Sequence, residues 1–343
     1  MNSLHSKKHI FIISQDLLKA GVDIDKFISN TEGVFLKIGL PDPYFHISRF
    51  PRDALATIRR FKDECPETII RIYAVGGDSI LFDCLNAIID LKDTELASVP
   101  LGQYAGFIRA FGDGKNQLFR DIELQATSQV IMTDAILCGS VYALNFCTIG
   151  LESYVTYRVN KFAERFKNIN CFLPPMLGRA FNRFQICLAQ LTAIANSTLL
   201  NQRYEVLVDG ESHSGSYSCI NIANGPCSSD SKCSAVCATP DDGLLDVLLV
   251  KSCSPAKFYG MYGNYNRGRY HKYPKYIKYL KAREVSISSE DPLVMQFDGE
   301  VFVDKEIKLK IAPAAVNFVA ASNLPYHRRA SLGRFGSLGR INL

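Results

Sequence analysis

The 343-residue sequence lacks any apolar run long enough to cross a membrane. A membrane-spanning helix needs about 18 or more apolar residues with few charges, and no segment reaches that length. The first apolar run, His9–Ser14, is too short for the core of a signal peptide, and no small-residue cleavage site follows it. The sequence therefore predicts a cytoplasmic protein whose association with a membrane is peripheral.

The sequence also lacks the cysteine spacing of a disulfide framework or of a zinc site. Its 11 cysteines are scattered between Cys65 and Cys253 without a repeated interval. The densest group, Cys227, Cys233 and Cys237, has no paired CxxC motif and no histidine nearby. Free thiols in a reduced compartment are therefore a better interpretation than a metal site.

The sequence also lacks the large excess of positive charge that is typical of nucleic-acid-binding proteins. The formal net charge is +5, with 21% charged and 47% hydrophobic residues. This balance is typical of a globular protein with a real core. The mild positive charge favours acidic partners such as nucleotides or anionic lipids.

The first 130 residues alternate between strand-like and helix-like segments. His9–Ser14 and Thr68–Val75 are apolar and rich in β-branched residues, as buried parallel strands are. Helical spacing appears between them at Asp53–Asp63 and after the second at Ile80–Leu91, and Ser98–Leu101 resembles a further strand. This order predicts a doubly wound α/β layer, which binds ligands at the carboxyl ends of its strands.

Beyond about residue 130, strand-like runs follow one another with turn residues between them. This pattern predicts a mainly antiparallel, β-rich domain with a helical insertion near Thr156–Asn196. The expected strands are Ala135–Leu144, Tyr204–Asp209, Ser216–Ala223, Leu244–Val250, Glu284–Ser288, Leu293–Phe297 and Ile307–Ile311. We therefore expect two domains, residues 1–130 and residues 131–313, with segment 314–343 returning to the first.

Gly76, Gly77 and Asp78 separate the second strand from the helix that follows it. Backbone N–H groups at the start of a helix attract phosphate, and glycines let a phosphate approach the backbone closely. Asp78 could orient a metal ion or a hydroxyl. The same turn also occurs for geometric reasons alone, so the pattern favours a phosphate site and a plain turn about equally.

Two acidic motifs lie in the second half of the chain. Asp241–Asp246 (DDGLLD) precedes an apolar strand and offers the oxygen ligands that Mg²⁺ prefers, although an ordinary hairpin turn explains it better from the pattern alone. The tripeptide Asp-Gly-Glu ends strands at Asp298–Glu300 and at Asp209–Glu211. A carboxylate there is suited to act as a general base toward an attacking alcohol, and the pattern cannot choose between the two copies.

The order of these motifs resembles that of the bacterial diacylglycerol kinase and lipid kinase family, over about residues 8–322. The resemblance rests on AVGGD at Ala74–Asp78, PLGQYAGFIRAFG at Pro100–Gly112, Asn224-Gly225, DDGLLDV at Asp241–Val247, GRYH at Gly268–His271 and FDGE at Phe297–Glu300. The acidic turn and the final DGE, at this separation, are its most specific parts.

The resemblance implies an N-terminal nucleotide-binding domain related to NAD kinases and phosphofructokinases, and a C-terminal sandwich-like domain that binds the lipid. It assigns the ATP phosphates to Gly76, Gly77, Asp78 and Ser79 and to a second loop with Gly102 and Gln103. It assigns Mg²⁺ to Asp242, the Leu244 carbonyl and the Thr239 carbonyl. Glu300 becomes the proton acceptor with Asp298 beside it, and Asp209–Glu211 becomes a surface hairpin.

The sequence departs from the family on the nucleotide side. The family's GGDGT is GGDSI here, so Ser79 replaces a glycine that faces phosphate and Ile80 replaces a threonine. PLGTGNDFAR becomes PLGQYAGFIRA, and the early NPxSG loop is not recognisable in Ser14–Gly21. Each lost charge-assisted hydrogen bond weakens binding by roughly 1.5 to 3 kcal/mol, so a non-catalytic descendant is the main alternative.

Lysines and tyrosines alternate between Arg267 and Arg283. Tyrosine suits the apolar boundary of a membrane and lysine its anionic phosphates. The candidate membrane-surface residues are Lys272, Lys275, Lys278, Tyr273 and Tyr276. A solvated face whose tyrosines cover the core explains the pattern equally well, whereas single-stranded nucleic acid is disfavoured because no nucleic-acid motif accompanies it.

The sequence thus predicts a kinase that uses ATP and Mg²⁺ to phosphorylate the hydroxyl of diacylglycerol or a related lipid at an anionic membrane surface. The alternative from another class is a lipid-binding or regulatory relative without phosphoryl transfer. An NAD kinase is a weaker third interpretation.

Overall fold

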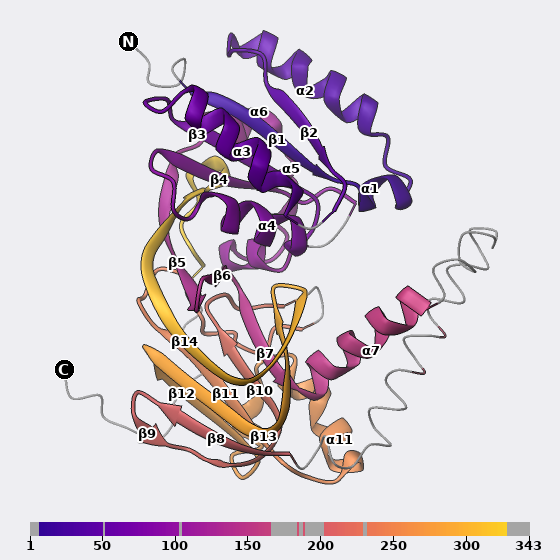
Figure 1. The fold of residues 1–343 in the computed structure, drawn as a ribbon, viewed down its shortest axis with the longest axis vertical. Helices are drawn as coiled ribbons and strands as arrows, with labels where there is room; N and C mark the ends of the chain where they lie inside the picture. The colour runs from indigo at the N-terminus through magenta and orange to yellow at the C-terminus, as the bar shows by residue number, and fades with distance from the viewer. Residues whose placement is uncertain are drawn as a thin grey trace. The chain divides into compact units, whose positions relative to one another are not determined.

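The computed structural model describes residues 7–50, 52–102, 105–165, 184, 188, 202–228 and 232–327. The described residues of Met1–Asn145, Asn224–Leu244 and Ile311–Leu343 form one compact unit, unit 1. Those of Phe146–Ala223 and Leu245–Lys310 form unit 2. Figure 1 follows the elements of both units along the chain. Within the described residues, no helix is both long and apolar enough to span a membrane.

Unit 1 is built around a parallel sheet with the strand order β14–β4–β3–β1–β2. Its strands are β1 (Lys8–Ser14), β2 (Tyr44–Ser48), β3 (Ile70–Val75), β4 (Thr94–Val99) and the last part of β14 (Glu300–Val319). Each neighbouring pair in this order runs parallel. A short antiparallel hairpin of β5 (Val130–Cys138) and β6 (Val141–Ala143) belongs to the same unit.

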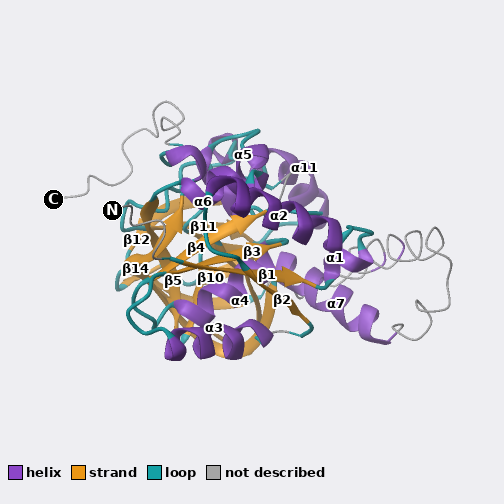
Figure 2. Ribbon diagram, turned by 90° about the horizontal axis from the view of Figure 1, so that it is seen from above, coloured by secondary structure: helices purple, strands orange, loops and turns teal. Residues whose placement is uncertain are grey.

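Helices cover both faces of this sheet. Figure 2 shows α2 (Ile24–Ile38) and α6 (Ile122–Thr127) on one side of the strands and α3 (Asp53–Glu64) and α4 (Asp78–Ile88) on the other. The alternation of side chains along β1 explains both layers, because Phe11 packs in one apolar core and Ile12 in the opposite one. Shorter helices are α1 (Asp16–Lys19), η1 (Phe107–Phe111), α5 (Asn116–Arg120) and η3 (Ala321–Asn323).

A buried ion pair connects two strands of this sheet. Arg71 of β3 is 1% exposed, and its Nε lies 2.6 Å from Oε2 of Glu95 in β4. The same guanidinium donates to carbonyl groups at the end of α6 and just beyond it. The strand predicted at Ser98–Leu101 is therefore wrong in its bounds: β4 starts at Thr94, because its first polar residues are buried through such partners rather than through apolar side chains.

Unit 2 is an antiparallel β structure with two described α-helices. Its strands are β7 (Phe146–Gly150), β8 (Arg203–Val208), β9 (Glu211–Ser212), β10 (Gly215–Ala223), β11 (Leu245–Lys251), β12 (Ile277–Ala282), β13 (Glu284–Phe297) and the first part of β14. Their order is β12–β11–β10–β7–β13–β14, and β8 pairs with β9, β10 and β13. The helices are α7 (Leu151–Arg165) and α11 (Pro255–Tyr265), and a short turn of helix, η2, covers Tyr270–Lys272.

The predicted fold class, a doubly wound α/β part followed by a β-rich part, is confirmed. Some bounds differ. The strand expected at Ala135–Leu144 is interrupted by a turn at Gly139, whose φ is 57°. The strands expected at Glu284–Ser288 and Leu293–Phe297 are one strand, β13, whose pairing with β14 shifts register between them. Most of the helical insertion expected near Thr156–Asn196 lies outside the described residues.

Candidate functional site

The first candidate element is the turn between β3 and α4 in unit 1. Gly76 has a φ of 146°, and a β-carbon there would lie 3.0 Å from Cγ2 of Ile80 and 3.1 Å from Cβ of Ser14. Glycine is therefore required by both conformation and space. Gly77 is the N-cap of α4 and supplies no side-chain cap, so the first turn of this helix has the character of an anion site.

Asp78 connects this turn to the loop that follows β4. Its Oδ2 accepts a hydrogen bond from the backbone N–H of Gly106 at 2.8 Å. A β-carbon at Gly106 would lie 2.6 Å from the carbonyl oxygen of Cys227, so this position is also closed to larger residues. Gly102 has a φ of 65° at the start of the same loop, and Gln103 lies outside the described residues. The structure thus brings the GGD turn and the PLG loop together.

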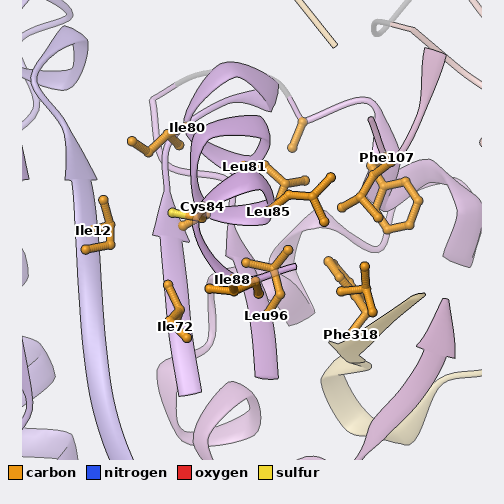
Figure 3. Close-up of a cluster of buried hydrophobic side chains, with 14 of the residues drawn as sticks. Ile12, Ile72, Ile80, Leu81, Cys84, Leu85, Ile88, Leu96, Phe107 and Phe318 are labelled. Carbon is orange, nitrogen blue, oxygen red and sulfur yellow. The ribbon is translucent and has the colours of Figure 1, made fainter. Parts of the chain in front are cut away.

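The two substituted residues of the turn have different surroundings. Ile80 is 5% exposed and belongs to the apolar core in Figure 3, where α4 packs over the sheet. Ser79 is partly exposed in the first turn of α4. Ile80 therefore serves the core, and Ser79 is the substitution that lies on the accessible side of the turn.

The acidic turn before β11 contains hydrogen bonds between residues close in sequence. Oδ1 of Asp242 accepts from the N–H of Leu244 at 3.0 Å. The Thr239 carbonyl accepts from the N–H groups of Asp241 and Asp242, at 2.8 and 3.3 Å. Because this carbonyl already accepts two hydrogen bonds, Thr239 is the weakest of the three metal ligands expected from the sequence.

Asp134 was not among the site residues predicted from the sequence. It lies in β5, is 4% exposed, and accepts from the N–H of Gly243 at 2.7 Å and of Ala314 at 2.8 Å. Burial raises the pKa of this carboxyl, the two backbone hydrogen bonds oppose the rise, and the nearby charges of Asp242 and Asp241 add to it. A single acid inside a largely apolar strand was the signal that could have found it.

The Asn224-Gly225 motif is part of the same scaffold. Nδ2 of Asn224 donates to the carbonyl groups of Asp134 and Leu144 at 2.8 and 2.7 Å. The N–H groups of Asn224 and Gly225 both donate to the carbonyl of Asn145. The motif therefore fixes the segment that leads to Cys227 and to the acidic turn.

The prediction that Cys227, Cys233 and Cys237 are all thiols is wrong, because Cys227 and Cys233 form a disulfide. A backbone hydrogen bond from Ser228 to Lys232 brings the ends of this short loop together. In the described part of the chain, no three His, Cys, Asp or Glu side chains gather closely enough to hold a metal ion. A cation at Asp242 would therefore need carbonyl, water and phosphate oxygens as well, as Mg²⁺ commonly does.

In unit 2, both Asp-Gly-Glu tripeptides form two-residue hairpin turns. Asp298 and Gly299 have φ values of 45° and 106°, and Asp209 and Gly210 have 48° and 84°. Positive φ at both central residues is the type I′ geometry that joins twisted antiparallel strands. The local sequence thus produces the same turn twice.

The two hairpins differ in their surroundings. Asp298 is 9% exposed, and its Oδ1 accepts from the N–H of Phe146 at 2.8 Å. Glu300 begins β14 opposite Phe297 and is partly buried. The side chain of Glu211 is 84% exposed. Burial therefore favours the Asp298 hairpin over the Asp209 hairpin as the candidate that carries the general base.

The last acid of DDGLLDV has a structural environment of its own in unit 2. Asp246 is fully buried, its Oδ2 lies 3.0 Å from Nζ of Lys281, and its Oδ1 accepts from the hydroxyl of Tyr279. The ring of Tyr279 stacks on that of Tyr270. The C-terminal part of the basic and aromatic segment, with Tyr279 and Lys281, is therefore held by contacts with the buried Asp246.

The rest of that segment is more open. Lys272 and Lys275 are exposed, and Tyr273 and Tyr276 are partly buried. Nζ of Lys257 lies 5.6 and 5.2 Å from the centroids of these two rings. Lys278 is exposed as well, but its Nζ lies 3.0 Å from Nδ1 of His213.

Comparisons with known proteins agree with this architecture. Residues 176–320 match a family model described as the YegS C-terminal NAD kinase beta sandwich-like domain. A Staphylococcus aureus protein named "Putative lipid kinase" is 21% identical over 255 residues, which cover 74% of this chain and 78% of the relative. Two Bacillus anthracis structures, one titled as a diacylglycerol kinase and one as a "putative diacylglycerol kinase", share the fold, with TM-scores of 0.62 and 0.65 and identities of 17% and 18%. They cover 93% and 91% of this chain, and the matches span 98% and 96% of those structures. The order of motifs, the family model and these relatives all make the chain similar, at low sequence identity, to the bacterial diacylglycerol and lipid kinase family.

Proposed function

We propose that this chain is a lipid kinase that uses ATP and Mg²⁺ to phosphorylate the free hydroxyl of diacylglycerol or a related lipid. The observation that carries the proposal is the hydrogen bond between Asp78 and Gly106. It joins two glycine-containing loops at the carboxyl ends of the neighbouring parallel strands β3 and β4, which is where α/β sheets bind phosphates.

In the proposed reaction, the acceptor hydroxyl oxygen forms a bond to the γ-phosphorus of ATP. The bond from that phosphorus to the bridging oxygen breaks, and ADP leaves. The proton of the hydroxyl passes to the carboxylate of Glu300, which acts as the general base. Asp298 positions this hairpin through its hydrogen bond to Phe146.

The oxygen ligands proposed for Mg²⁺ are the carboxylate of Asp242 and the carbonyl of Leu244. Carboxylate and carbonyl oxygens are the donors that this hard cation prefers, and Asp134 fixes the turn that carries them. When bound, Mg²⁺ would neutralise phosphate charge. The site residues Gly76, Gly77, Asp78, Ser79 and Gly102 would lie along the nucleotide phosphates.

The exposed lysines of unit 2 support a peripheral membrane contact as part of this function. Lys272 and Lys275 flank Tyr273, and Tyr276 follows them. Lysines attract anionic headgroups, and a partly buried tyrosine suits the boundary between headgroups and acyl chains.

A lipid-binding relative without catalysis is the second candidate, and the sequence of the phosphate turn favours it. Ser79 is partly exposed in the first turn of α4, where the family has glycine, so it adds a β-carbon and a hydroxyl beside the expected phosphate position. This candidate keeps lipid binding and loses nucleotide affinity.

The two candidates separate in one pair of measurements on the purified chain. Calorimetric titration with ATP, with and without Mg²⁺, measures nucleotide binding, and transfer of labelled phosphate to dioctanoylglycerol measures the reaction. Binding that depends on Mg²⁺ together with labelled lipid supports the kinase. Lipid binding without nucleotide binding or transfer supports the non-catalytic relative.

A further inference from the structure

Three polar side chains lie in one row across the middle of the unit 2 sheet. Thr148 of β7 is in register with Asn221 of β10 on one side and with Gln296 of β13 on the other. Residues in register on neighbouring strands point to the same face of a sheet. The residues that follow them in sequence, such as Ile149 and Phe297, are apolar and buried. The row is therefore a polar feature set in a largely apolar sheet.

The two outer members of the row make hydrogen bonds to the two helices of unit 2. Nδ2 of Asn221 donates to the hydroxyl of Tyr265 in α11. The hydroxyl of Thr156 in α7 donates to Oε1 of Gln296 at 3.3 Å. Asn221 is 1% exposed, whereas Gln296 is only partly buried. The solvent exposure of the row therefore increases from Asn221 on β10 to Gln296 on β13.

The central member has no comparable partner. Thr148 is 5% exposed, and within the described residues its hydroxyl makes no hydrogen bond. A buried hydroxyl without a partner destabilises a fold, and valine has the same shape and an equally strong preference for strands. Fold stability therefore does not explain a threonine here, and a polar group of a ligand would.

We propose that Thr148 and Gln296 form a binding site for the uncharged polar head of the acceptor lipid, through hydrogen bonds to its ester carbonyl or hydroxyl groups. The inference rests on the proposed lipid kinase function and specifies which part of the substrate unit 2 recognises. A hydroxyl donates and accepts, an amide does the same, and neither carries a charge. The site therefore suits a neutral glycerol ester.

The position of Gln296 fits this role. Gln296 lies on β13 two residues before Asp298, the first residue of the turn, which corresponds to roughly 7 Å of extended chain. The Asp298 turn leads directly to Glu300, the proposed base. A lipid whose ester groups reach the row is therefore held by the same strand that leads to the base.

The test uses two variants at one position. Thr148→Val removes only the hydroxyl, and Thr148→Ser keeps it. Dioctanoylglycerol is titrated into the full chain without nucleotide, and binding is followed by calorimetry. Thr148→Val should weaken binding about tenfold, which is the contribution of one uncharged hydrogen bond, and Thr148→Ser should bind about as well as the unmodified chain. The melting temperature of Thr148→Val should be unchanged or higher.

Two results would overturn the site: no binding of dioctanoylglycerol by the unmodified chain, or equal binding by Thr148→Val and the unmodified chain. Phosphoryl transfer is measured in a separate assay, so the lipid site and the kinase activity can each be refuted without the other. A chain that binds dioctanoylglycerol through Thr148 but transfers no phosphate supports the site and refutes the kinase. A chain that transfers phosphate with the same KM for this lipid in Thr148→Val refutes the site and supports the kinase.

Discussion

The carboxylate of Asp298 accepts a hydrogen bond from the backbone N–H of Phe146, which ties the turn before Glu300 to the start of β7. The turn itself is a type I′ hairpin that any Asp-Gly pair between two strands could form. What distinguishes this hairpin is that its aspartate is buried, whereas Asp209 in the second hairpin is exposed. A carboxylate placed on such an anchored turn keeps a constant position, as a general base requires.

Glu300→Gln should lower phosphoryl transfer at least about 100-fold, because the amide cannot accept the proton of the acceptor hydroxyl. ATP binding should be unchanged, since the proposed nucleotide contacts belong to unit 1. The matched control is Glu211→Gln, which makes the same change in the exposed copy of the tripeptide and should leave the rate unaltered. Equal rates for the Glu300 variant and the unmodified chain would mean that another group accepts the proton.

Asp242→Asn should abolish the Mg²⁺ dependence of nucleotide binding while leaving the protein folded. The asparagine oxygen can still accept from the N–H of Leu244, so the turn keeps its hydrogen bond and loses only the charge. Asp242→Ala should give the same loss of Mg²⁺ dependence and also lower the unfolding free energy by about 1 kcal/mol. Calorimetric titration of ATP with and without Mg²⁺ measures the first effect, and urea unfolding measures the second. An unchanged Mg²⁺ dependence in both variants would leave Asp242 as a turn residue only.

Restoring the family's phosphate turn, with Ser79→Gly and Ile80→Thr together, should raise kinase turnover. Glycine removes a β-carbon near the proposed phosphate position, and threonine adds a hydroxyl. Because Ile80 is buried in the core shown in Figure 3, the double variant should also lose about 1 to 3 kcal/mol of stability. Ser79→Gly alone separates the two effects, since it should improve ATP affinity without that loss.

Unchanged turnover in both of these variants would mean that nucleotide binds through a rearranged loop. If neither the unmodified chain nor the double variant transfers phosphate to any lipid tested, the non-catalytic relative becomes the better account of this protein.

Lys272→Gln with Lys275→Gln should weaken binding to anionic vesicles about tenfold or more at low salt, because each lysine near such a surface contributes about 1 kcal/mol. The effect should shrink as salt rises, since the field is screened over about 10 Å at 0.1 M. Lys305→Gln with Lys308→Gln removes the same charge from β14 and serves as the control. Vesicle sedimentation with neutral and with anionic lipids measures the binding of both double variants. Equal binding to the two kinds of vesicle would remove the membrane argument.

Stability should depend on pH through His9 of β1. Burial, together with the charges of Arg71 and Lys7, lowers the pKa of His9 to about 3, and its Nδ1 lies 2.8 Å from the hydroxyl of Tyr73. The folded state therefore binds the proton more weakly than the unfolded chain, whose histidine has a pKa of about 6.5. The stabilising contribution is complete above that value and is lost as pH falls toward the folded value.

Between pH 8 and pH 5, the unmodified protein should lose about 2 kcal/mol more unfolding free energy than His9→Asn, which can keep a hydrogen bond to Tyr73 but does not titrate. Urea unfolding at several pH values measures the difference. Parallel pH curves for the two proteins would show that His9 is accessible to protons in the folded state.

Elements defined by their own local pattern could be predicted from the sequence with nearly correct bounds. His9–Ser14 and Thr68–Val75 correspond to β1 and β3, and Asp53–Asp63 corresponds to α3. Apolar alternation and helical spacing are properties of adjacent residues, so a single sequence contains them. The sequence also located the turn from Gly76 to Asp78, because glycines between a strand and a helix are a local signal.

The partners of polar residues could not be predicted in this way. Asp134 bonds to Gly243 and Ala314, residues 109 and 180 positions away. The row through Thr148 exists only because three strands from distant parts of the chain fall into register.

The sequence by itself therefore determined the layers of the fold, its turns and the family that its motifs resemble. The tertiary structure alone decided which of two identical Asp-Gly-Glu turns is buried, which acid supports the acidic turn and which cysteines meet. The physical reason is that periodicity and turn geometry arise between neighbours in the chain, whereas burial and hydrogen bonding of a polar group depend on residues that only folding brings close.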